Sequence, residues 1–201
     1  MQAESTHDRI LAVAAEYFVD EGFRHARMVE LASRAGIARA TLYKHFDTKE
    51  ALLLALNDKV IDSARGQMAV LTNRLDDDET VAARIAQWLE LGLTDRWWLN
   101  TLRLVVLEDT QEALLGDEGA TAGIVDQVSK ALVSLIREGI KREEFRAEIQ
   151  PRETARAIQA ALLGLQRNHV SVRPLVPLKS GNQVAAFIHL VIAGLRKGFE
   201  P

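Results

Sequence analysis

Apolar residues recur at helical spacing along almost the whole chain, and this periodicity is the feature that most constrains the fold. Strand-type alternation is absent, and only four prolines interrupt 201 residues. Apolar groups three and four residues apart share one face of a helix, whereas strict alternation is typical of a half-buried strand. The sequence therefore predicts an all-α fold of about nine helices.

Breaks between the helices are indicated by Gly, Asp, Pro and capping residues. A first helix is expected from Thr6 to Glu21, ended by Gly22, and two short helices follow it. Thr48 is a good N-cap for a long helix that runs to about Thr72. Further helices are expected at about 79–94, 96–115, 121–142, 151–170 and 183–198. The segment 171–182, with two prolines and a glycine, is expected to be a loop.

The composition limits both the compartment and the chemistry. The chain has no cysteine, so disulfides, thiolate metal sites and a cysteine nucleophile are excluded. The N-terminus, Met1 to Arg9, is polar, and no apolar run approaches the length of a membrane span. We therefore expect a cytoplasmic protein without a membrane association, and no pattern predicts a metal or a cofactor.

The net charge of −3 argues at first against a nucleic-acid partner, but its distribution matters more than its sum. Four basic residues and one acidic residue lie between Arg34 and Lys49. The opposing carboxylates lie elsewhere, in the run 76–79 and in residues 108–118, and such runs are usually solvated loops. The sequence therefore contains a local basic face.

Residues 27–46 meet the physical requirements of a helix-turn-helix. Ala32 is small, as it must be where a second helix crosses the first, and Gly36 can adopt the left-handed conformation that ends the first helix. Leu42 then points into the shared core, which Ile37 and Phe46 complete. With Leu42 inward, the outer part of the second helix would enter a DNA major groove.

The outer part of that second helix is chemically suited to DNA. It carries a guanidinium, a hydroxyl, a phenol, an ammonium and an imidazole, followed by Lys49 at a helix start, and these groups suit phosphates or base edges. Two short helices joined by a tight turn also occur without any DNA role, and the spacing alone leaves that alternative open. The exposed chemistry favours DNA binding.

These residues resemble the N-terminal signature of TetR/AcrR-type regulators. The resemblance covers about residues 8–56 and rests on Gly22-Phe23, Leu31-Ala32, Ala35-Gly36-Ile37, Thr41-Leu42-Tyr43, His45-Phe46 and Lys49-Glu50-Ala51-Leu52. Glu144-Phe145-Arg146, leading to a helix that contains Ala161-Leu162-Leu163-Gly164-Leu165, resembles the weaker C-terminal pattern of the family.

The resemblance implies roles for individual positions. Arg39 occupies the variable place that often reads a base, and Thr41 would contact base or backbone. Tyr43, His45 and Lys49 match phosphate-contacting positions. The remaining candidates for DNA contact are Ala40 and Lys44 on the same helix and Arg27 at the start of the preceding one. Where the family usually has Thr or Ser, this chain has Ala26-Arg27, so the hydroxyl cap is lost and Arg27 substitutes a charge.

The last two helices are apolar on more than one face, which implies a second packing partner. One explanation is that both are central in the core of the monomer. The preferred explanation is a symmetric homodimer in which these helices form a four-helix bundle. The candidate dimerisation residues are Ala157, Ala161, Gly164, Phe187, Val191, Ile192 and Leu195.

All three tryptophans, Trp88, Trp97 and Trp98, lie within eleven residues of one another. The clustering suggests a pocket for an apolar or aromatic effector, although tryptophans that simply fill a helical core would give the same pattern. The family resemblance favours the pocket, because such regulators bind effectors among the corresponding helices. The candidate lining residues are Trp88, Trp98, Leu102 and His169.

Together these observations predict a DNA-binding domain at residues 1–50 and a ligand-sensing and dimerisation domain at residues 51–201. The expected function is a ligand-responsive repressor that binds a near-palindromic double-stranded operator, with repression implied by the family resemblance only. A helical protein-binding adaptor is the alternative, but it would leave the basic face of residues 39–49 unexplained. Enzymatic activity is not expected, since the five histidines are scattered and no catalytic motif is present.

Overall fold

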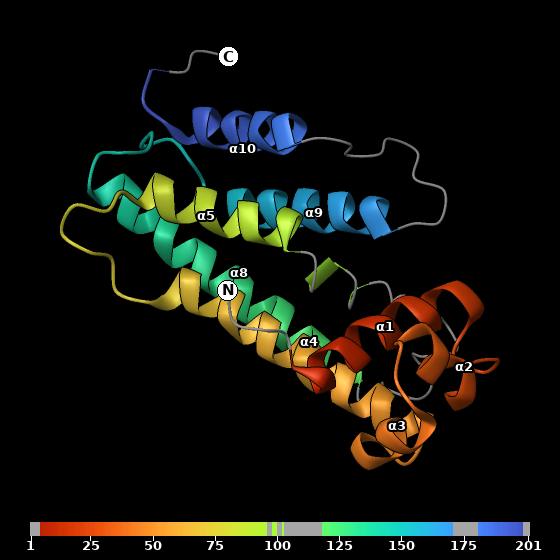
Figure 1. Ribbon diagram of the computed structural model, residues 1–201. Helices are drawn as coiled ribbons and strands as arrows, with labels where there is room; N and C mark the ends of the chain where they lie inside the picture. The colour runs from red at the N-terminus through yellow and green to blue at the C-terminus, as the bar shows by residue number, and fades with distance from the viewer. Residues whose placement is uncertain (1–4, 96–97, 100–101, 103–117, 171–180, 199–201) are drawn as a thin grey trace. The chain divides into compact units, whose positions relative to one another are not determined.

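The computed structural model describes residues 5–95, 98–99, 102, 118–170 and 181–198. These residues form α-helices joined by turns, with one isolated β-bridge, and they confirm the all-α prediction (Figure 1). The helices are α1 (Thr6–Glu21), α2 (Met28–Arg34), α3 (Arg39–His45), α4 (Lys49–Thr72), α5 (Val81–Thr94), α8 (Glu118–Lys141), α9 (Pro151–Val170) and α10 (Gly181–Leu195).

Most helix boundaries agree with the sequence analysis. α1, α4 and α9 begin and end at the predicted residues, and α5, α8 and α10 lie within a few residues of theirs. Gly22 ends α1 with φ 79°, and Thr48 caps α4 through a hydrogen bond from the Ala51 backbone N–H to Thr48 Oγ1 (3.1 Å). Most of the helix predicted at 96–115 and of the loop predicted at 171–182 lies outside the described residues.

The chain divides into two compact units, and the division falls within α4. Unit 1 comprises residues 1–63 and 96–118, and unit 2 comprises residues 64–95 and 119–201. The predicted domain boundary at residue 50 differs from this division. The physical reason is that Leu52, Leu53 and Leu56 of α4 are buried in the same core cluster as α1, α2 and α3.

The core of unit 1 is built from three helices and the first turns of α4. Ile10, Ala14 and Phe18 are fully buried along one face of α1, four residues apart, as an amphipathic helix requires. Phe18 meets Phe23 edge-to-face, with ring centroids 5.2 Å apart. This core fixes the helices that carry the candidate interface.

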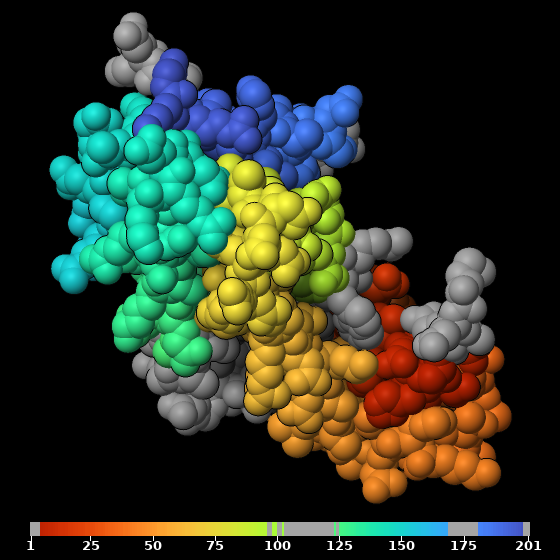
Figure 2. All heavy atoms as spheres, turned by 90° about the vertical axis from the view of Figure 1, so that its left-hand side faces the viewer, coloured from red at the N-terminus to blue at the C-terminus, as the bar shows by residue number. Residues whose placement is uncertain are grey.

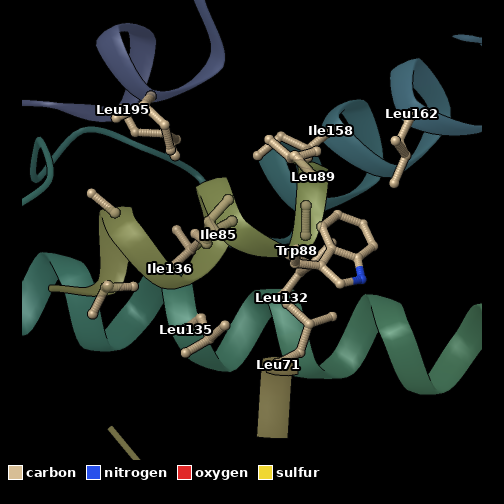
Figure 3. Close-up of a cluster of buried hydrophobic side chains, with 14 of the residues drawn as sticks. Leu71, Ile85, Trp88, Leu89, Leu132, Leu135, Ile136, Ile158, Leu162 and Leu195 are labelled. Atoms are coloured by element: carbon tan, nitrogen blue, oxygen red, sulfur yellow. The ribbon is translucent and has the colours of Figure 1, made fainter. Parts of the chain in front are cut away.

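The core of unit 2 gathers side chains from five helices. Figure 3 shows Ile85, Trp88 and Leu89 of α5 facing Leu132, Leu135 and Ile136 of α8, with Ile158 and Leu162 of α9, Leu71 of α4 and Leu195 of α10 around them. α5 is central, because both α9 and α10 pack against it (Figure 1).

The segment 143–146 after α8 ties three helices of unit 2 together. Glu144 accepts hydrogen bonds from the backbone N–H groups of Val81 (3.1 Å) and Ala82 (3.2 Å), so its carboxylate caps the start of α5. Phe145 is 0% exposed and forms a bridge with Arg196 after α10. The backbone N–H of Arg146 donates to the Leu195 carbonyl (3.0 Å).

A buried arginine fixes the end of α4 against α5. The Arg84 side chain, from a residue only 7% exposed, donates to the carbonyls of Val70 (2.8 Å) and Asn73 (3.0 Å). The same guanidinium pairs with the Glu79 carboxylate, and this hydrogen bond holds the pKa of Glu79 below its ordinary value. The Val70 carbonyl, one of the last four of α4 that lack a partner within the helix, is thereby satisfied, and the Asn73 carbonyl just after α4 is satisfied as well.

Two glycines of α8 provide a matched test of this packing. A Cβ at Gly139 would lie 2.3 Å from Phe145 Cδ2, whereas a Cβ at Gly123 would meet nothing within 4 Å. We predict that Gly139→Ala lowers the free energy of unfolding by about 1–3 kcal/mol through overpacking. Gly123→Ala should leave it unchanged or raise it by up to about 1 kcal/mol through helix propensity. Urea denaturation of both variants measures the difference, and equal stabilities would contradict the assigned packing.

Candidate nucleic-acid interface

α2, the following turn and α3 form a helix-turn-helix through the contacts that the sequence predicted. Ala32 and Leu42, at 1% and 0% exposed, lie in the core of unit 1. Gly36 adopts φ 63°, and the Ile37 backbone N–H reaches back to the Ala32 carbonyl (3.0 Å). This hydrogen bond closes the end of α2 and directs the chain into α3.

The outer face of α3 presents the predicted side chains to solvent. Arg39, Ala40, Lys44 and His45 are exposed, and Thr41 is half-buried. Tyr43 is 45% exposed, which is unusual for an aromatic side chain of its size. Within the described residues, the side chains of Arg39 and Lys44 form no ion pair, so both cations are available to an anion.

His45 belongs to a small aromatic group at the end of α3. The His7 ring stacks on the Phe46 ring with centroids 4.9 Å apart, and it lies 6.0 Å from the His45 ring. Phe46 is buried, whereas His7 and His45 are exposed. The first turn of α1 therefore adds a second imidazole beside the candidate surface, and the sequence analysis missed it because His7 lies far from α3 in the chain.

Tyr17 supplies a capping hydroxyl at the start of α2. The Arg27 side chain makes no cap hydrogen bond, but the Arg27 backbone N–H donates to Tyr17 Oη (3.1 Å), and the Tyr17 hydroxyl donates to Glu30 Oε2 (3.0 Å). Burial raises the pKa of Tyr17, which keeps the phenol protonated as a donor. The signal in the sequence is a tyrosine on the buried face of α1, since a buried phenol requires a partner.

Arg34 is not part of the free basic face that the charge count suggested. Its guanidinium pairs with Glu21 (2.8 Å) and Glu30 (3.4 Å) and lies 4.3 Å from the centre of the Tyr17 ring. Its charge is therefore neutralised within unit 1. The count along the sequence failed here because Glu21 belongs to α1 and becomes a neighbour only after folding.

Lys49 also has a structural role at the start of α4. Its ammonium donates to the carbonyls of Phe23 and Arg24, both at 2.9 Å, and lies 4.8 Å from the centre of the Phe23 ring. An ammonium has three donors, so one remains for another acceptor. The backbone N–H groups of the first turn of α4 also favour an anion there.

The predicted ligand-lining residues are divided between the two units. Trp88 is buried in unit 2, whereas Trp98 and Leu102 are half-buried and belong to the 96–118 stretch of unit 1. The side chain of His169 lies outside the described residues. Gln67 of α4 was not predicted, yet it is only 8% exposed and its Nε2 has no hydrogen-bond partner among the residues that the structure describes. Buried side-chain amide groups normally have a hydrogen-bond partner.

The predicted dimerisation residues separate into two groups. Ala157, Ala161 and Gly164 are exposed on α9, and Phe187 and Val191 of α10 are half-buried. Ile192 and Leu195, also predicted as interface residues, are buried in the core of unit 2 and pack within the monomer. The apolar group that α10 does expose is Leu190, at 67%, and α9 exposes Leu163 at 39%.

Other classes of site find no support in the described part of the chain. Within it, no group of three or more His, Asp or Glu residues has a geometry suited to a metal ion. Among the described helices, none combines the length and the hydropathy that crossing a bilayer would require.

Comparisons with known proteins agree with this geometry. Residues 10–56 match the model of the family "Bacterial regulatory proteins, tetR family". The chain is 32% identical over 83 residues to the HTH-type transcriptional activator FasR of Mycolicibacterium smegmatis, a match covering 41% of this chain and 38% of FasR. It is 27% identical over 154 residues to the nucleoid occlusion factor SlmA of Marinobacter nauticus, covering 77% of this chain and 76% of SlmA.

The fold is also that of solved regulators. The crystal structure of the MbdR regulator from Azoarcus sp. CIB matches 95% of this chain and 99% of its own, with a TM-score of 0.64 and 21% identity. The match to the family model covers most of α1, the helix-turn-helix and the first turns of α4. None of these comparisons supports the alternative of a protein-binding adaptor. Residues 10–56 therefore form a helix-turn-helix segment of the tetR type, and the described helices share the fold of solved regulators.

Proposed function

We propose that the protein is a ligand-responsive repressor that binds a near-palindromic operator as a homodimer. The observation that carries the proposal is the outer face of α3, where two cations without ion-pair partners in the described structure flank an exposed phenol. Leu42 is 0% exposed beneath this face, so packing fixes its orientation. Such a face fits the major groove, and binding to chromosomal DNA would occur in the cytoplasm.

Contacts to base edges would give sequence specificity, and contacts to phosphates would give most of the affinity. Arg39 at the start of α3 would read a base edge, and a bidentate arginine–guanine contact discriminates by about 1–3 kcal/mol. The candidates for phosphate or backbone contact are Lys44, Tyr43, His45, Thr41, Arg27 and the one remaining donor of Lys49. About five or six phosphate contacts per subunit would give most of the affinity and a steep salt dependence.

Dimerisation would supply the second half-site contact. α9 exposes Ala157, Ala161 and Gly164, which permit close approach of a partner helix, and α10 exposes Leu190. An apolar leucine that is two-thirds exposed gains free energy when a partner covers it. Twofold association would double the DNA contacts and predicts the symmetry of the operator.

Unit 2 would bind the effector. The unpartnered Nε2 of Gln67 is a buried donor on α4, one helical turn before Leu71, which shares a core cluster with Trp88. An effector with an apolar or aromatic body and an acceptor oxygen would satisfy this group. Binding would release DNA only if the effector prefers the arrangement that does not fit the operator.

The first test is selection of binding sites from random duplex DNA at about 0.15 M salt, where exposed charges are screened as in a cell. We expect a twofold-symmetric consensus, followed by tight and saturable binding in fluorescence anisotropy. A reporter under that operator then distinguishes repression from activation, the activity in the name of FasR. If no sequence is enriched, with the purified protein dimeric and folded, the operator proposal fails.

A pair of substitutions on α3 separates base reading from phosphate binding. Arg39→Ala should weaken the selected operator at least about thirtyfold, since a base contact worth about 1–3 kcal/mol is lost in each half-site, and should leave non-specific DNA little changed. Lys44→Gln should weaken both DNAs alike and reduce the salt slope of the dimer by about two, which is about one for each subunit. Anisotropy titrations at several salt concentrations measure both effects, and identical profiles for the two variants would contradict the assigned roles.

The dimer is tested with matched glutamate substitutions at exposed sites of unit 2. Leu190→Glu and Ala161→Glu should give folded monomers with much weaker operator binding, because a dimer would bury an unpaired carboxylate. Ala83→Glu, at an exposed site on α5, is the control and should stay dimeric. Sedimentation analysis at micromolar protein gives the mass, and a stable dimer of Leu190→Glu would rule out this part of α10 as interface.

A further inference from the structure

Unit 2 contains an open cleft between the end of α4 and the C-terminal half of α8. Its volume is about 620 Å³, within the range of small-molecule sites. Leu71 and Leu135, both buried, and half-buried Ala131 form its apolar floor. Figure 2 faces this end of unit 2, with residues 72–80 in yellow beside the green-to-teal C-terminal half of α8.

Cations outnumber anions around the cleft. Arg74, Arg137 and Lys141 line it with exposed side chains, and none of them forms an ion pair with a described residue. A fourth cation, Arg142, is occupied, since it donates to Glu138 Oε1 (2.9 Å) and holds the pKa of that carboxyl below its ordinary value. The remaining carboxylate of the lining belongs to Asp77. An excess of positive charge therefore faces an apolar floor.

One wall of this cleft is held in place by buried hydrogen bonds. Residues 71–75 end α4 and continue beyond it, and Arg84 donates to the carbonyls of Val70 and Asn73 on this stretch. The opposite wall, residues 131–142 of α8, is anchored by Leu132 and Ile136, both 0% exposed. One wall of the cleft is therefore the end of α4 with residues 73–77 after it, held in part by Arg84, and the other wall is a helix segment anchored in the core.

We propose that this cleft binds an amphipathic organic anion, with an aromatic or aliphatic body and a carboxylate, sulfonate or phosphate head. A small inorganic anion would pair with the cations but leave the apolar floor in water. An uncharged apolar compound would cover the floor but leave Arg74, Arg137 and Lys141 without a partner. Only a ligand with both parts uses both surfaces.

This site is separate from the effector site proposed above. Trp88, Trp98 and Leu102 do not line the cleft, and neither does Gln67. The proposal therefore does not depend on DNA binding or on an effector among the tryptophans. A ligand here would contact α4, whose first turns also supply Leu52 and Leu53 to the core of unit 1.

The test uses the full chain and a fluorescent probe of the required chemistry, 8-anilinonaphthalene-1-sulfonate. The cleft variant is Arg137→Gln/Lys141→Gln, and the control variant is Lys130→Gln/Arg152→Gln, which removes two exposed cations of α8 and α9 that do not line the cleft. We expect the cleft variant to lose one probe site per chain, or to bind the probe at that site at least about tenfold more weakly. The control should stay within about twofold of the unmodified protein.

A second probe, N-phenyl-1-naphthylamine, has the same aromatic body without the sulfonate. It should bind more weakly than the sulfonate and with equal affinity to all three proteins. Circular dichroism and thermal melting should be the same for all three, because the substituted residues are exposed. Equal sulfonate binding by the cleft and control variants would overturn the proposal, as would equal affinity of the unmodified protein for both probes. Absence of sulfonate binding would overturn it as well.

Discussion

The burial of one phenylalanine ring against one glycine organises unit 2. Phe145 is fully buried, and its ring occupies the space that any side chain at Gly139 would need. The backbone N–H of Phe145 also donates to the Gly139 carbonyl (3.1 Å), so the chain folds back on the end of α8. This reversal places Glu144 at the start of α5 and Arg146 beside the end of α10. The contacts among α5, α8 and α10 thus depend on the close approach of the Phe145 ring to Gly139.

The helix-turn-helix could be predicted from the sequence because its determinants are local. Ala32, Gly36 and Leu42 lie within eleven residues, and each has a requirement that a single position reveals: small size, a positive φ or burial. The helix boundaries followed for the same reason, since caps and glycines act over one turn. Where neighbouring residues along the chain determine the local structure, the sequence pattern is sufficient to predict it.

The features that the sequence did not reveal all concern interactions between elements distant in sequence. Arg34 was counted with the basic face, but Glu21 of α1 neutralises it. Lys49 was expected to meet a phosphate, and two of its donors are already used by carbonyls before α2. Ile192 and Leu195 belong to a helix that is apolar all round, so periodicity could not show which side faces α5. Gln67 carried no pattern at all, because an unsatisfied amide is defined only by its surroundings.

These corrections change the electrostatic account of DNA binding. With Arg34 neutralised and Lys49 largely occupied, the proposed interface would rely on Arg39, Lys44 and Arg27, on the imidazoles His7 and His45, and on the first backbone N–H groups of α4. Arg34 and Lys49 instead stabilise the helices around α3. Arg34 and Lys49 fix α2 and α4 to α1 and to residues 23–24, and a cation that holds the scaffold contributes to binding by keeping α3 oriented.

α4 is the element through which the ligand binding proposed for unit 2 would affect DNA binding. Its first turns supply Leu52, Leu53 and Leu56 to one core, its last turn supplies Leu71 to the other, and it is about 36 Å long at 1.5 Å per residue. Thr48 caps its start, and Arg84 donates to the Val70 carbonyl in its last turn, so neither end can move without loss of these hydrogen bonds. A ligand that contacts Gln67 or the end of α4 therefore acts on a helix shared by both cores. Such a ligand can change the affinity for DNA only as far as the ligand itself binds one arrangement of α4 more tightly than the other.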